Sequence, residues 1–145
     1  MIPKFRGLSV ESNNEESWKY GYLIEDGREA FIINKVIEAN EQYITIGSWD
    51  PVRPETVSQS TGLFDKNGQE IFEGDIVSDG HTTGDIKNHL TLGFYMIDEK
   101  GNENFLSDTV DTEGFDEAKE FMRNSIEIIG NVYQNPELLE VDHDR

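Results

Sequence analysis

The chain has 145 residues, of which 30 are acidic and 12 are basic, giving a formal net charge of −18. This charge excludes the basic surface that binds nucleic-acid phosphates or an anionic membrane, so neither direct nucleic-acid binding nor membrane binding is expected. Cysteine is absent, which removes disulfides, thiolate nucleophiles and zinc–thiolate sites and fits a reducing cytoplasm.

The first predicted element is a β-hairpin at residues 20–34, "YGYLIEDGREAFIIN", with Asp26-Gly27 at its tip. Both tip residues tolerate the positive φ angles of a type I′ turn. Aromatic residues alternate with polar ones here, so one face of an N-terminal sheet is predicted to be aromatic-rich: Trp18, Tyr20, Tyr22, Phe31 and Tyr43. Such a face is usually core, whereas an exposed one would be a protein-binding patch ringed by acid.

Residues 36–47 predict one or two further strands, which complete a β-rich N-terminal lobe at residues 1–50. Residues 51–60 are predicted to be a connector between two lobes. They contain Pro51 and Pro54, and neither proline nor the residue before it suits a helix interior.

The next stretch, "TGLFDKNGQEIFEGDIV" at 61–77, predicts a hairpin and the start of another strand. A two-residue turn at 67–68 would place Phe64 opposite Ile71, whereas a three-residue turn at 66–68 with a bulge would place Leu63 opposite Ile71. In either register the apolar residues are buried, and these side chains are expected in water: Asp65, Lys66, Gln69 and Glu70. The stretch is therefore interpreted as scaffold.

The polar residues 78–91 predict an exposed loop, and 93–107 a third hairpin turning at Lys100-Gly101-Asn102. Three hairpins in one small chain argue for a mainly β, antiparallel protein, built as a β-meander or as a small barrel. A short α-helix is predicted near residues 114–125, because Phe115, Ala118 and Met122 recur at helical spacing. A closing strand follows, and 141–145 is predicted to be a disordered tail.

Three blocks of the chain resemble the YopX family, small proteins of Gram-positive bacteria and their phages and prophages. They are "KFRG" with "WKYGYLI", then "PETVSQSTGLFDKNGQEIFEGDIV", and finally "EIIGNVYQNPELL". The resemblance implies an SH3-like β-barrel for a C-terminal lobe at 61–140, a β-rich N-terminal lobe, and a phage or prophage setting. It brings no catalytic or binding residues with it.

Motifs for catalysis, cofactors and metals are not found. The chain has no phosphate-binding glycine loop and no Gly-x-Ser-x-Gly nucleophile elbow. His81 and His89 flank Asp85, but their eight-residue spacing is not that of a zinc site. No catalytic residue, cofactor site or metal site is therefore predicted.

Two segments supply the candidate partner-binding residues. Residues 54–62 are hydroxyl-rich, as ligand-facing loops often are, and 98–120 holds the densest supply of carboxylates. The candidate set is Glu55, Thr56, Gln59, Asp98, Glu99, Asp108, Asp111 and Glu113.

The function expected from the sequence is a phage or prophage accessory protein in the cytoplasm of a bacterial host, without catalytic activity, that binds a host or phage protein through an exposed β-surface. One alternative is an acidic DNA mimic that inhibits a host nucleic-acid-binding protein. Another is a small enzyme or metal-dependent protein. Edge strands of a small barrel often pair with a second subunit, so a homo-oligomer is also open.

Overall fold

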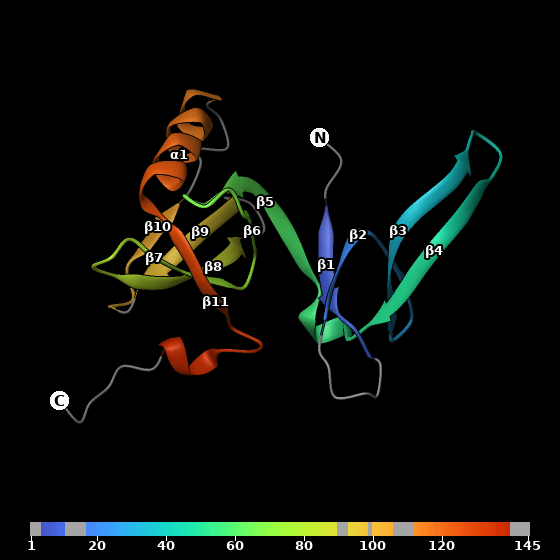
Figure 1. The fold of residues 1–145 in the computed structure, drawn as a ribbon, viewed down its shortest axis with the longest axis horizontal. Helices are drawn as coiled ribbons and strands as arrows, with labels where there is room; N and C mark the ends of the chain where they lie inside the picture. Colours follow the sequence, from blue (N-terminus) through green and yellow to red (C-terminus); the bar gives the residue numbers. More distant parts are fainter. Residues whose placement is uncertain (1–3, 11–16, 90–92, 99, 106–111, 140–145) are drawn as a thin grey trace. The chain divides into compact units, whose positions relative to one another are not determined.

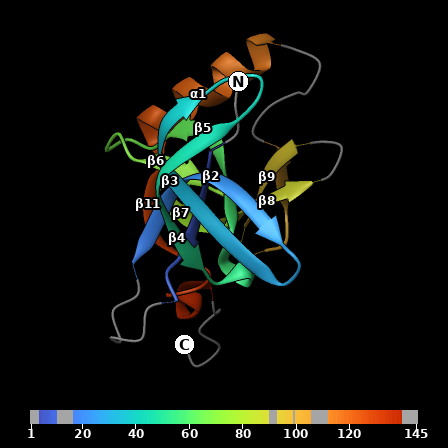
Figure 2. The same cartoon turned by 90° about the vertical axis from the view of Figure 1, so that its right-hand side faces the viewer.

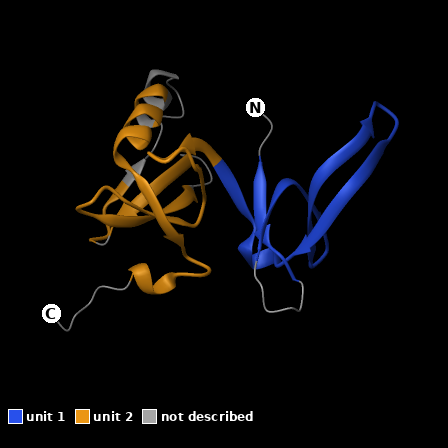
Figure 3. Cartoon of the chain, viewed as in Figure 1, with its two compact units in different colours: residues 1–60 blue, residues 61–145 orange. Residues whose placement is uncertain are grey.

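The protein is described from a computed structural model, which places residues 4–10, 17–89, 93–98, 100–105 and 112–139 (Figure 1). The chain divides into two compact units, Met1–Ser60 and Thr61–Arg145 (Figure 3). Both consist mainly of antiparallel strands, so the predicted β-rich class is confirmed. The predicted tail, 141–145, lies outside the described residues.

Within its described residues, unit 1 contains four strands and a short 3-10 helix, and its last residues begin a fifth strand that continues into unit 2. These elements are β1 (Phe5–Leu8), β2 (Trp18–Asp26), β3 (Glu29–Ala39), β4 (Ile44–Val52), η1 (Pro54–Thr56) and β5 (Ser58–Phe64). The hydrogen-bonded order is β4-β3-β2-β1-β5. The predicted connector at 51–60 thus comprises the end of β4, all of η1 and the start of β5.

Strands β2 and β3 form a hairpin (Figures 1 and 2). Its turn lies one residue later than predicted. Asp26 pairs with Glu29, so the turn residues are Gly27 and Arg28 rather than Asp26 and Gly27. In this register Leu23 faces Ile32, and apolar residues meet apolar residues on both faces of the hairpin. Cross-strand apolar pairing therefore decides the register that the turn residues alone left ambiguous.

One face of this sheet carries the small core of unit 1. Ala30, Ile32 and Val52 are buried there, and partly buried hydrophobic residues pack against them: Phe5, Leu23 and Val57. Gly21 lets β2 lie against β3, because a Cβ atom at Gly21 would meet the carbonyl oxygen of Ile33 at 2.1 Å. The glycine of the "WKYGYLI" block is thus a requirement of strand packing.

Unit 2 contains the rest of β5 with β6 (Glu70–Phe72), β7 (Asp75–Ser78), β8 (Thr83–His89), β9 (Gly93–Asp98), β10 (Glu103–Phe105), α1 (Thr112–Ser125), β11 (Glu127–Asn131) and η2 (Pro136–Leu139). Its five-stranded sheet has the order β10-β9-β8-β7-β11, and no closed barrel is found among the described residues. The helix begins two residues before its predicted start at 114. The predicted loop at 78–91 is wrong in part, because it contains β8.

The core of unit 2 explains why β8 forms in a polar stretch. Ile86 of β8 is buried with Leu63, Ile71, Val77, Met122 and Ile126. A single apolar side chain thus anchors β8, and its pairing with β7 and β9 satisfies the backbone. The rest of the β8 sequence gives no alternating apolar pattern from which the strand could be predicted.

The hairpin at 61–77 adopts the second predicted register. The amide of Asp65 donates to the carbonyl of Gln69 at 2.8 Å, and the amide of Gly68 donates to the carbonyl of Asp65 at 3.0 Å. Gly68 has φ +79°, as the third residue of a three-residue turn with a bulge requires. Leu63 therefore lies opposite Ile71, and both are core residues.

The prediction that Asp65 lies in water is wrong, because its side chain is 1% exposed. Its carboxylate accepts hydrogen bonds from the amides of Asn67 and Gln69, at 2.9 and 2.8 Å, and from the amide of Ile128 at 3.0 Å. Asp75 is also buried and accepts from the amide of Phe72 at 2.8 Å. These bonds stabilise the buried charges and hold the turns.

The block "EIIGNVYQNPELL" comprises β11, a polar turn and η2, and its turn is hydrogen-bonded to the hairpin block. The side-chain carbonyl of Asn131 accepts from the amides of Tyr133 and Gln134, at 3.1 and 2.9 Å. The amide of Val132 donates to the carbonyl of Gly74 at 2.8 Å. The second and third sequence blocks are therefore hydrogen-bonded to each other within unit 2.

Candidate functional site: an apolar face on the sheet of unit 1

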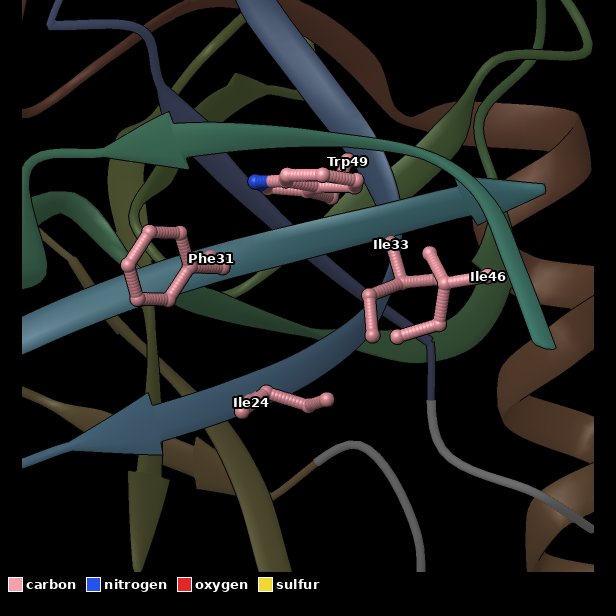
Figure 4. Close-up of a pocket in the computed structure, with 5 residues that line it drawn as sticks. All are labelled: Ile24, Phe31, Ile33, Ile46 and Trp49. Atoms are coloured by element: carbon pink, nitrogen blue, oxygen red, sulfur yellow. The ribbon is translucent and has the colours of Figure 1, made fainter. Parts of the chain in front are cut away.

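The face of the unit 1 sheet opposite its core carries a shallow apolar groove (Figure 4). Five side chains from three adjacent strands line it: Ile24 of β2, Phe31 and Ile33 of β3, and Ile46 and Trp49 of β4. We call these five residues the apolar face. The core of unit 1 covers only one face of this sheet, so the apolar side chains on the other face stay exposed.

Strand register brings the apolar face together. Ile24 pairs with Phe31 across β2 and β3, and Ile33 pairs with Trp49 across β3 and β4. Directly opposed residues point to the same side of a sheet. Tyr22 pairs with Ile33 on its other side, so Ile33 has an aromatic neighbour on each adjacent strand.

The groove has a buried floor and exposed walls. Ile33 is only 5% exposed, whereas Ile24 is 45% and Trp49 57% exposed. Tyr22, beside the floor, is 51% exposed. An incoming apolar side chain would therefore lose contact with water on several sides at once, which is the condition for a favourable hydrophobic contact.

The turn end of the apolar face is acidic. Asp26 and Glu29 form the last pair of the hairpin, next along the same faces of β2 and β3 from Ile24 and Phe31. Both are exposed, and like charges directly opposite each other on a sheet destabilise the hairpin. This end of the face therefore attracts a positive charge.

The predicted partner-binding residues are not on the apolar face. Glu55 is exposed on η1 and Gln59 is half-buried on β5, while Thr56 is 3% exposed. The Thr56 hydroxyl accepts from the amide of Leu8 at 2.9 Å and donates to the carbonyl of Arg53 at 2.7 Å. Its hydroxyl is thus used inside unit 1.

Asp98 belongs to unit 2 and holds the turn between β9 and β10. Its carboxylate accepts from the amides of Asn102 and Lys100, both at 2.9 Å, and from the Asn102 side-chain amide at 3.2 Å. The bond from the Asn102 backbone amide is the main cause that lowers the pKa of Asp98. Glu99, Asp108 and Asp111, and the side chain of Glu113, lie outside the described residues.

The described residues hold no group of three or more His, Cys, Asp or Glu side chains that could bind a metal ion. Asp85 is mostly buried and contacts the Lys87 ammonium at 3.2 Å, and His81 is exposed. In the part of the chain that the structure describes, no helix has the length and apolar character to cross a membrane.

The protein is thus mainly β and has two units. Unit 1 carries an exposed apolar sheet face, and unit 2 contains most of the second sequence block and all of the third. The YopX protein family matches residues 4–140, nearly the whole sequence. The chain therefore belongs to the YopX family. No match was found among curated proteins.

A solved structure is similar to the chain over both units. It is the crystal structure of protein EF1440 from Enterococcus faecalis, with 28% sequence identity and a TM-score of 0.56. The likeness covers 97% of this chain and 99% of that chain. The length and fold of the two proteins therefore correspond from end to end.

Sequence reasoning identified one of the five lining residues, Phe31, and missed the four others: Ile24, Ile33, Ile46 and Trp49. The available signal was the run of alternating aromatic residues, which correctly pointed to this sheet. Tyr20, Tyr22 and Tyr43 are 44%, 51% and 50% exposed. The aromatic-rich surface is thus an exposed one, the case for which the sequence predicted a protein-binding patch.

Proposed function

We propose that the protein is a non-catalytic protein-binding module whose apolar face docks a partner segment carrying apolar side chains next to Lys or Arg. The observation that carries this proposal is the exposed groove between Ile24 and Trp49. Exposed apolar side chains gathered on one face are typical of protein interaction sites, and aromatic residues are enriched at their centres.

The groove favours an apolar side chain in the partner segment. Trp49 offers a large, stiff side chain as one wall, and the buried Ile33 provides a preformed floor. An aliphatic or aromatic side chain laid across the floor would be enclosed on two sides. Little backbone entropy is lost on the protein's side, because the lining residues lie on paired strands.

The acidic turn end of the apolar face favours a Lys or Arg in the partner segment. Residues 25–29, "EDGRE", carry three carboxylates and one arginine, and Asp26 and Glu29 lie on the side of the apolar face. A Lys or Arg of the partner would relieve the repulsion between these two carboxylates. The net charge of −18 adds long-range attraction for a basic partner and repulsion for an acidic one.

The proposed setting is the cytoplasm of a Gram-positive host, where the protein serves a phage or prophage as an accessory protein. Membership of the YopX family and the likeness to an Enterococcus faecalis protein support this setting. The absence of cysteine is in keeping with a reducing compartment.

The test is a selection of random short peptides from a display library against the intact protein, followed by titration of the enriched peptides. Enriched peptides should combine bulky apolar residues with Lys or Arg. Trp49→Ala should weaken their binding by about tenfold or more, as for a central interface residue. Added salt should also weaken peptide binding by the unmodified protein, because it screens the attraction between the acidic turn end and the Lys or Arg of the peptide.

Two charge-reversing variants complete the design. Asp26→Lys alters the apolar face, while Glu25→Lys makes the same change in net charge on the opposite side of β2, since Glu25 pairs with the core residue Ala30. Only Asp26→Lys should weaken binding severalfold. Equal loss in both variants with full binding by Trp49→Ala would favour the DNA-mimic alternative instead. Enrichment of acidic peptides, or no enrichment, would overturn the proposal.

A further inference from the structure

We infer that two copies of this chain pair through the outer edge of β4, antiparallel to each other, at the hairpin arm formed by residues 35–46. This inference goes beyond the proposed function and does not depend on it. It rests on the strand pairing of the arm, the direction of its backbone amides and the distribution of charge along β4.

The arm lacks a third strand within the described residues. Strand β2 pairs with β3 only as far as Ile33, whereas β3 and β4 continue to pair as far as Ala39 and Ile44 (Figure 1). A two-stranded hairpin is marginally stable in water. This one exposes large apolar side chains: Val36 at 38%, Ile37 at 65%, Tyr43 at 50% and Ile44 at 64%.

The backbone of β4 presents hydrogen-bonding groups at its outer edge. The amide of Asn40 donates to the carbonyl of Tyr43 at 3.0 Å, which makes these two residues a hydrogen-bonded pair. Pairs alternate along an antiparallel ladder, so Thr45 bonds towards Glu38 while the amide and carbonyl groups of Ile44 point away from β3. The register shift between Val36 and Glu38 leaves its extra residue, Ile37, on β3, so β4 itself alternates without a break and the amide and carbonyl groups of Ile46 also point outward.

This edge is complementary to itself. With a two-fold axis at Thr45, Ile44 of one copy lies opposite Ile46 of the other, and both residues have outward-facing amide and carbonyl groups. The pairing makes four backbone hydrogen bonds and sets the two Thr45 residues face to face as a non-hydrogen-bonded pair. The two arms then form one four-stranded sheet, which supplies the missing third strand to each.

The distribution of charge favours this edge of β4 as the place where a second copy binds. The chain carries −18, so most surfaces of two copies repel each other. Residues 43–49, "YITIGSW", contain no charge, and they lack the lysines by which exposed edge strands usually avoid pairing. Repulsion is therefore smallest where the backbone is ready to pair.

The first test measures molar mass by sedimentation equilibrium on the full chain, over a range of concentrations and salt. We expect a species of twice the 16.6 kDa chain mass, favoured by added salt, which screens the repulsion between copies. Ile44→Pro removes an outward amide from each copy and should weaken the dimer about 30-fold. Ile44→Thr keeps the amide and serves as the control, with a much smaller effect.

The second test places a single cysteine in the cysteine-free chain. The Cα atoms of a non-hydrogen-bonded pair lie close enough for a disulfide. Under mild oxidation, Thr45→Cys should therefore form covalent dimers on the order of tenfold faster than Asn67→Cys. Asn67 is exposed at a turn of unit 2, so it reports random collision.

Three results would overturn the inference: a monomer at every concentration and salt, a dimer that Ile44→Pro leaves intact, or equal cross-linking of the two cysteine variants. A monomer that binds peptides in an Ile44-dependent way would assign the edge to a foreign strand. Failure here is distinguishable from failure of the proposed function, because dimerisation strengthens with salt whereas binding of a basic segment weakens.

Discussion

The carboxylate of Asp65 accepts a hydrogen bond from the backbone amide of Ile128, at 3.0 Å, across 63 residues of sequence. Next to it, the amide of Lys66 donates to the carbonyl of Ile126 at 2.8 Å. These two bonds tie the β5–β6 turn to the start of β11. The buried acid of the "GLFDKNG" segment is thus a structural acceptor, and its charge needs no ligand to explain it.

Asp65→Asn should destabilise the protein by about 1–3 kcal/mol, because the Asn amide cannot accept from all three backbone amides that the carboxylate satisfies. Asp98→Asn is the matched control. Asp98 makes the corresponding bonds at the β9–β10 turn, but it is only half-buried there, whereas Asp65 is fully buried. Urea denaturation followed by circular dichroism should give a clearly larger loss for Asp65→Asn. Equal losses would contradict the structural role of the Ile128 bond.

Gly21→Ala should destabilise unit 1 by about 3 kcal/mol or more, because φ is +153° there and the added Cβ would overlap the carbonyl of Ile33. Gly27→Ala should cost only about 1 kcal/mol, since φ is +61° but nothing lies within 4 Å. The two tryptophans, Trp18 and Trp49, both belong to unit 1, so tryptophan fluorescence during unfolding measures the effect. Similar midpoints for the two variants would disprove the close approach of β2 to β3.

Asp26→Lys should stabilise the β2–β3 hairpin by about 0.5 kcal/mol, because it replaces a like-charged pair with an opposite-charged one opposite Glu29. Glu25→Lys, which faces Ala30, controls for the change in net charge. Thermal unfolding should therefore show a higher Tm for Asp26→Lys than for Glu25→Lys. The reverse order would mean that Asp26 already has a favourable partner in the free protein.

Two turn aspartates of unit 2 should make stability depend on acidic pH. Backbone amides lower the pKa of Asp98 and Asp79 from 3.8; for Asp98 the Asn102 amide is the main cause, and for Asp79 the Thr82 amide. Since the folded-state pKa is lower than the unfolded one, each bond stabilises the fold above about pH 4. That stabilisation is lost as the pH falls through the folded-state pKa.

The difference in unfolding free energy between wild type and Asp98→Asn should accordingly narrow below pH 4. A carboxyl-carbon NMR titration provides the direct measurement, with an expected midpoint below 3.8 for both aspartates. A midpoint at or above that value would show that the turn amides do not favour the carboxylate.

The sequence predicted the elements better than their registers. Leu63 opposite Ile71 was one of two alternatives, and Gly68 with the Asp65–Gln69 bond decided between them. Burial of Asp65 could not be predicted, because its third donor, Ile128, comes from the other end of unit 2. Local patterns contain no information about such a distant partner.

From the sequence, the aromatic-rich face could be predicted to bind a protein only if it was exposed. Aromatic alternation indicated the sheet, but whether that face is core or surface depends on what covers it, which periodicity does not reveal. Trp49 reaches Ile33 because β3 and β4 pair with irregularities near Lys35 and Val36. Bulges of this kind shift which residues face each other, and no turn or alternation signal marks them.

Because the bond between Asp65 and Ile128 joins distant parts of the sequence, it also bears on the order in which the two units can fold during synthesis. The strands of the unit 1 sheet are synthesised first, the last of them being β5, which ends at Phe64. Strand β11 (Glu127–Asn131), which pairs with β7, is synthesised much later. A ribosome must therefore synthesise the chain as far as Asn131 before β11 can complete the sheet of unit 2. A product that stops after α1 would carry a complete apolar face on unit 1. In unit 2, Val77 would lack the strand beside it and the core would lack Ile126, so this unit would be open to proteases.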